Sequence, residues 1–125
     1  MSLSQSEKRF TIYHNPRCTK SRETLDRLKK AGIEPRVVEY LKNPISADDL
    51  DRLLKQLKLQ PHDLARKSED RYVDLELATS PPRTRKEWVH LLAANPVLIE
   101  RPIVTDGERA VLGRPPENVD RLLTS

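Results

Sequence analysis

The first third of the chain alternates between short strand-forming stretches and one helically patterned segment. Residues 10–13 are strand formers and predict a short buried strand. From Thr19 onward the apolar residues recur three positions apart, and Gly32 marks the end of the predicted helix. Residues 36–40 predict a second strand. Strand, helix and strand in this order predict a βαβ unit with parallel strands and a right-handed crossover.

The middle of the chain has a helical pattern throughout. Capping-box patterns at Ser46 and Thr84 each open a helix with apolar residues along one face. Shorter helical pieces are expected over residues 62–67 and 71–77. We therefore predict a helical insertion over about residues 45–94 between two pairs of strands.

Strand signals return near the end of the chain. Residues 103–105 predict a third strand, Asp106-Gly107 favours a tight hairpin turn, and residues 109–112 predict the antiparallel return strand. Pro115-Pro116 suits the start of a final helix that runs to about Leu123. The predicted fold class is α/β, with a mixed four-stranded sheet and the order β-α-β, helices, β-β-α.

Composition narrows the class of protein. A length of 125 residues suits one domain over residues 10–125, with a flexible tail over residues 1–9. The chain has neither a leader-like segment nor the ~20 consecutive apolar residues of a membrane span, so we expect a cytoplasmic protein without a membrane partner. The net charge of +4 is spread along the chain and aromatic residues make up only 4%, which argues against nucleic-acid binding.

Cys18, the single cysteine, is the strongest candidate for chemistry. It lies where a strand meets the start of a helix, and the free N–H groups and the helix dipole there favour a thiolate. Cationic and imidazole side chains lie within four positions of it: His14, Arg17, Lys20 and Arg22. The alternative is a structural cysteine, which the polar, basic flanks disfavour.

Ser21 stands where a Cys-x-x-Cys motif has its second thiol, so an outside thiol must release any bonded sulfur. A lone cysteine also argues against a disulfide or a metal site.

Four segments together resemble a known family. The segment Tyr13–Cys18, followed by Ser21-Arg22, resembles the active-site segment of glutaredoxin-dependent arsenate reductases. Glu100–Val104 and Leu112–Pro115 resemble the arginine-bearing segments of the same family, and Leu64–Lys67 is similar to a further one. The matches occur in the family's order, and the wider group includes the Spx-like proteins of the same fold.

The resemblance implies a thioredoxin-like fold with a helical insertion. It also implies that Cys18 is the catalytic nucleophile, that His14 helps to activate the thiol, and that Pro102 follows a cis peptide bond beside the cysteine. The implied ligands of the substrate oxyanion are three arginines: Arg66, Arg101 and Arg114. Guanidinium groups suit this role because their planar forks match tetrahedral oxyanions.

The activity that the resemblance implies is the reduction of arsenate to arsenite, without a bound cofactor or metal. The Cys18 thiolate would attack arsenic to form a thioarsenate ester, which glutathione and glutaredoxin would then reduce. Two alternatives stay open. An Spx-like regulator would bind RNA polymerase, but its redox switch is a Cys-x-x-Cys pair that this chain lacks. A glutathione-linked thiol reductase acting on another substrate would not need its arginines gathered in one pocket.

Overall fold

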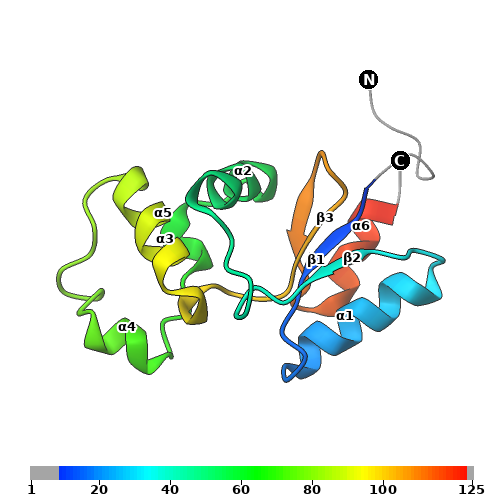
Figure 1. Cartoon of the computed structure of the whole chain (residues 1–125), viewed down its shortest axis with the longest axis horizontal. Coiled ribbons are helices and arrows are strands. Elements are labelled where there is room, and N and C mark those ends of the chain that lie inside the picture. Colours follow the sequence, from blue (N-terminus) through cyan, green and yellow to red (C-terminus); the bar gives the residue numbers. More distant parts are fainter. Residues whose placement is uncertain (1–8, 124–125) are drawn as a thin grey trace. The chain divides into compact units, whose positions relative to one another are not determined.

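The computed structural model describes residues 9–123 and divides the chain into two compact units (Figure 1). The first unit combines the chain up to Asn43 with the chain from Arg101 onward, and the second is Pro44–Glu100. The second unit encloses the helical insertion expected from the sequence. The tail expected over residues 1–9 falls, up to residue 8, outside the described residues.

The first unit contains a mixed four-stranded sheet with the strand order β2-β1-β3-β4. β1 (Thr11–Tyr13) pairs in parallel with β2 (Arg36–Val38) and antiparallel with β3 (Ile103–Thr105). β3 in turn pairs antiparallel with β4 (Ala110–Leu112). The mixed sheet and the parallel βαβ pair predicted from the sequence are therefore confirmed.

A single apolar core holds the helices of this unit to its sheet. α1 (Thr19–Lys30) joins β1 to β2 and buries Leu28 completely, next to Ile12 and Val104. The predicted final helix is divided in the structure into a 3-10 turn, η2 (Pro116–Val119), and a short α6 (Asp120–Leu123), which complete the core. This core fixes the start of α1 relative to the sheet, and the candidate site lies there.

The second unit is helical in its described structure. Its elements are α2 (Ala47–Leu57), α3 (Pro61–Leu64), α4 (Asp70–Asp74), α5 (Arg85–Ala94) and the 3-10 turn η1 (Pro96–Leu98). The hydroxyl oxygens of Ser46 and Thr84 accept hydrogen bonds from backbone N–H groups in the first turns of α2 and α5. Both caps lie where the sequence predicted them, and α2 packs against α5.

Two short predicted helices differ from the structure. The helix expected over residues 62–67 ends at Leu64, because Ala65 is extended and pairs with Ile99 in an isolated β-bridge. The helix expected over residues 71–77 ends at Asp74, and the backbone at Glu76 takes the left-handed conformation with φ 55°.

Three strands are shorter than the sequence predicted: β1, which begins at Thr11 rather than residue 10, and β2 and β4. The second strand stops at Val38 because the chain turns there, with the N–H groups of Lys42 and Asn43 donating to the carbonyl oxygen of Glu39. The return strand begins at Ala110 rather than residue 109, because the N–H of Arg109 still donates to the Asp106 carboxylate in the hairpin turn.

Candidate active site

Cys18 is the N-cap residue of α1. Its backbone is extended (φ −94°, ψ 123°), its N–H donates to the carbonyl of Asn15 at 3.0 Å, and its carbonyl accepts from the N–H of Arg22 at 3.0 Å. These bonds end the loop after β1 and begin the helix at the same residue. The side chain is 9% exposed, so the sulfur lies just beneath the surface.

Opposing influences set the pKa of Cys18, and the net effect is a pKa below the usual value of 9.0. Burial alone raises the pKa, because it disfavours the charged thiolate. Hydrogen bonds from the backbone N–H groups of Ser21 and Lys20, together with the charges of Arg101 and Arg114, lower it by more. The structure thus favours the nucleophilic form of the only thiol in the chain.

Two of the three arginines named from the sequence lie at this thiol. Arg114 Nη1 donates to Cys18 Sγ at 3.7 Å and to the carbonyl oxygen of Arg101 at 3.4 Å. Arg101 precedes Pro102, and the bond between them is cis, as is the Arg114–Pro115 bond, which the sequence did not indicate. Positive charge therefore reaches the sulfur from residues more than eighty positions further along the chain.

Arg66, the third arginine, belongs to the second unit and has carboxylate partners there. Its Nη1 bonds to Glu69 Oε1, and its Nε lies 3.7 Å from Glu100 Oε1. Its backbone N–H donates to the carbonyl of Leu98 at 2.7 Å. The Arg66 side chain is only 20% exposed and is fixed by these ion pairs, so it is not a solvated surface arginine.

His14 bonds to Ser21, on the first turn of the helix that Cys18 caps. The imidazole is buried, its Nδ1 lies 2.6 Å from Ser21 Oγ, and that oxygen also accepts a hydrogen bond from the N–H of Asn15 at 3.0 Å. Burial lowers the pKa of His14, and the charges of nearby Arg22 and Lys29 lower it further against the opposing charge of Glu39. The neutral imidazole thus supports Ser21, whose own N–H donates to the Cys18 sulfur.

Arg22 stabilises the loop before Cys18 through hydrogen bonds of its guanidinium group. Its Nη1 donates to the carbonyl of Pro16 at 2.9 Å, and its Nη2 lies 3.3 Å from Thr19 Oγ1. The sequence placed Arg22 near the thiol only as a charge and placed Ser21 there only as the replacement for a second thiol. The signal for their structural roles was their position on the first turn of the helix after the cysteine.

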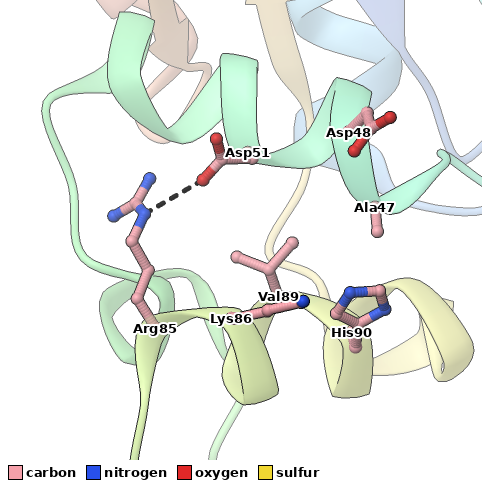
Figure 2. Close-up of a pocket in the computed structure, with 7 residues that line it drawn as sticks. All are labelled: Ala47, Asp48, Asp51, Arg85, Lys86, Val89 and His90. Atoms are coloured by element: carbon pink, nitrogen blue, oxygen red, sulfur yellow. Dashed lines mark hydrogen bonds and ion pairs between the residues drawn. The ribbon is translucent and has the colours of Figure 1, made fainter.

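The second unit has a pocket of its own, of about 400 Å³, between α2 and α5 (Figure 2). Carboxylates of α2 line one wall and cationic side chains of α5 the other, with Asp51 facing Arg85 at 3.0 Å. None of the residues named from the sequence as catalytic or substrate-binding lines this pocket. We therefore place the candidate chemistry at Cys18.

Among the described residues, no group of three or more histidine, cysteine, aspartate or glutamate side chains is arranged to hold a metal ion. In the same part of the chain, no helix is both long enough and apolar enough to cross a membrane.

The fold and this site define a thioredoxin-like protein with one cysteine at the start of its first helix and arginines facing it. The chain belongs to the ArsC family, whose model matches residues 13–122. It is 48% identical over 113 residues to YfgD of Escherichia coli K12, a protein described as uncharacterized, with 90% of this chain and 94% of YfgD covered.

Relatives with a named activity are also close. An arsenate reductase of Haemophilus influenzae is 38% identical, with 90% of this chain and 97% of that protein covered. The solved structure of an arsenate reductase from Vibrio cholerae is 42% identical and superposes with a TM-score of 0.86, covering 91% of this chain and 97% of that one.

Proposed function

We propose that this protein reduces arsenate to arsenite, with Cys18 as the nucleophile and with glutathione and glutaredoxin supplying the electrons. The observation that carries the proposal is the guanidinium of Arg114, which lies 3.7 Å from the Cys18 sulfur, and the charge of Arg101 also helps to lower the pKa of this thiol. The names of the relatives from Haemophilus influenzae and Vibrio cholerae supply the substrate.

The two arginines meet the main electrostatic difficulty of the reaction. A thiolate and an oxyanion repel each other because both are negatively charged. The cationic guanidinium groups of the two arginines offset that repulsion, and their N–H groups bind the oxygens of the substrate. Arg66 is the third ligand that the family resemblance implies. Glu69 and Glu100 hold its guanidinium in the second unit, so under this proposal Arg66 would exchange a carboxylate partner for the oxyanion.

The chemistry transfers two electrons in balanced steps. The Cys18 thiolate attacks arsenic(V) and hydroxide leaves, which gives a thioarsenate ester without a change of oxidation state. Glutathione then replaces a second hydroxyl on arsenic. A glutaredoxin thiolate attacks the glutathione sulfur, the S–As electron pair stays on arsenic, and arsenic(III) forms together with a glutathione–glutaredoxin disulfide. Water cleaves the remaining Cys18–As bond and releases arsenite and the free thiol.

The single cysteine of the chain requires this outside supply of thiol. Ser21 stands at the position of a second cysteine, and its hydroxyl bonds to His14, so no thiol of the protein's own can take over the sulfur bond. The same fact disfavours a Cys-x-x-Cys redox switch of the Spx-like kind. The gathering of Arg101 and Arg114 at the sulfur favours a small oxyanion over a bulkier thiol substrate. A free thiolate also suits a reducing compartment such as the cytoplasm.

The test is arsenite formation from arsenate with glutathione and glutaredoxin, for the wild type, Cys18→Ser and Arg114→Ala. We expect no turnover for Cys18→Ser and a raised KM for Arg114→Ala. Omission of glutaredoxin or of glutathione from the wild-type reaction tests the electron source separately. Wild-type protein that alkylates rapidly at Cys18 but produces no arsenite would contradict the proposed substrate while leaving the reactive thiol intact.

A further inference from the structure

Three separate segments of the first unit meet around Thr24 and Gly113. Thr24 lies on α1 and is completely buried. Its Oγ1 lies 2.7 Å from the carbonyl oxygen of Lys20, one helical turn earlier, and 3.2 Å from the carbonyl oxygen of Gly113. The hydroxyl therefore links α1 to the segment that follows β4.

Gly113 approaches this point so closely that no side chain fits. A Cβ atom on Gly113 would lie 2.5 Å from Thr24 Oγ1, 2.8 Å from Thr24 Cγ2 and 2.8 Å from Pro102 Cγ. The N–H of Gly113 also donates to the carbonyl of Pro102 at 2.9 Å. Gly113 thus packs against both α1 and Pro102 without space for one methyl group.

Pro102 and Gly113 are each adjacent in the sequence to one of the two arginines at the candidate site. Arg101 directly precedes Pro102, and Arg114 directly follows Gly113. Cys18 caps the helix on which Thr24 lies. The contact therefore fixes the backbone origins of both arginines relative to the helix that carries the thiol. Displacements of about 1 Å in such an arrangement can cost on the order of 10²-fold in rate.

We propose that Thr24 and Gly113 are positioning residues, which hold Arg101 and Arg114 at the Cys18 sulfur by closing α1 against the Pro102 segment. As far as it concerns oxyanion binding, this inference rests on the proposed function. The part of the inference that concerns the thiol does not rest on the proposed function, because Arg114 contacts the Cys18 sulfur and the charges of both arginines act on it whatever the substrate.

The test compares Gly113→Ala, Thr24→Val and Thr24→Ser. The first readout is the rate of Cys18 alkylation by iodoacetamide as a function of pH, without arsenate. The second is KM and kcat for arsenate. Because the methyl of Gly113→Ala pushes the segments apart, we expect its alkylation to be about tenfold slower at pH values below the pKa of the wild-type thiol, as for a thiol whose pKa has risen by about one unit. We expect KM for arsenate to rise more than kcat falls.

The two substitutions of Thr24 separate the hydroxyl from the volume of the side chain. Valine keeps the volume and removes the hydroxyl, so we expect slower alkylation, whereas serine keeps the hydroxyl and should stay within about twofold of the wild type. In the double variant Thr24→Ala with Gly113→Ala, two of the three close contacts are relieved. We therefore expect it to alkylate faster than Gly113→Ala alone.

Leu122→Ala is the matched control, because it removes buried volume from the apolar core of the same unit while leaving the hydroxyl of Thr24 and the backbone of Gly113 unsubstituted. We expect it to lower the stability and to leave the alkylation profile unchanged. Equal alkylation rates for Thr24→Val, Thr24→Ser and wild type would overturn the inference, as would a profile of Leu122→Ala shifted as far as that of Gly113→Ala. A shifted thiol profile without any arsenate turnover by the wild type would uphold the positioning role and contradict only the proposed substrate.

Discussion

Ser21→Ala removes a hydroxyl that hydrogen-bonds to two groups of the loop before Cys18. The oxygen accepts the N–H of Asn15 at 3.0 Å and lies 2.6 Å from His14 Nδ1. Ser21 is completely buried and His14 is 6% exposed, so water cannot take the place of the hydroxyl at the imidazole.

The size of the effect follows from the surroundings of each partner. The buried His14 nitrogen loses its bond without compensation, which costs about 1–3 kcal/mol. Asn15 is only half-buried, so water can satisfy part of the bonding of its N–H. Alanine at a helical position returns about 0.5 kcal/mol through its better helix propensity. We therefore expect Ser21→Ala to lower the free energy of unfolding by about 1–3 kcal/mol.

Urea unfolding of the reduced protein measures this difference, with the exposed Ser68→Ala as the control for a serine whose loss should change little. A double-mutant cycle with His14→Ala isolates the bond itself. The coupling between the two substitutions should reach about 0.5–3 kcal/mol, because each single change already removes the shared hydrogen bond. A loss under about 0.5 kcal/mol for Ser21→Ala, or strict additivity with His14→Ala, would refute the reasoning.

Three further outcomes follow from the described structure. Folding lowers the pKa of Cys18, so the free energy of unfolding should rise as the pH rises from the lowered pKa toward the usual 9.0. The same contribution is lost as the pH falls through the lowered pKa. Urea unfolding at several pH values across this range measures the change. Leu28→Ala, at a fully buried position, should lower the free energy of unfolding in urea by about 2–5 kcal/mol. Under the proposed function, in which Arg66 is a ligand of arsenate, Glu69→Gln should lower the KM for arsenate in the steady-state assay, because Arg66 loses a competing carboxylate.

Each of these outcomes has a control. Cys18→Ser has no titrating thiol, so the rise of stability with pH should disappear in that variant. Leu25→Ala, on the same helix but only partly buried against the core, should cost less than Leu28→Ala. Asp26→Asn changes the net charge as Glu69→Gln does but breaks only an exposed pair with Lys30, so an equal fall in KM would show that charge alone is responsible.

Local signals in the sequence were sufficient for most of the elements. Helix α1 follows from its apolar spacing, and the starts of α2 and α5 follow from hydroxyl caps that act within three residues. The predicted helix over residues 62–67 failed at Ala65 because its partner, Ile99, lies more than thirty residues away. Pairing across such a distance leaves no periodic trace in the segment itself.

The same limit applies to the site. The position of Cys18 at the start of a helix follows from local pattern alone, whereas Arg101 and Arg114 could be named only through the family resemblance, because the fold brings them across more than eighty residues of sequence. The role of Gly113 was not predictable from its neighbours, since its contact with Thr24 spans 89 positions. A glycine between a strand and a Pro-Pro pair suggests a turn, but its actual constraint here is the lack of space.

The structure also explains why a serine at the fourth position of the Cys-x-x-Ser segment is more than a missing thiol. A cysteine at position 21 would place a larger, weakly hydrogen-bonding sulfur between His14 and the N–H of Asn15, where the structure has a hydrogen bond of 2.6 Å and one of 3.0 Å. The backbone N–H of Ser21 lowers the pKa of the Cys18 thiol, and the Ser21 hydroxyl holds the preceding loop through Asn15, so one residue contributes to both. A chain that uses this position for support cannot also use it for a resolving thiol, and this favours the proposed supply of electrons from another molecule.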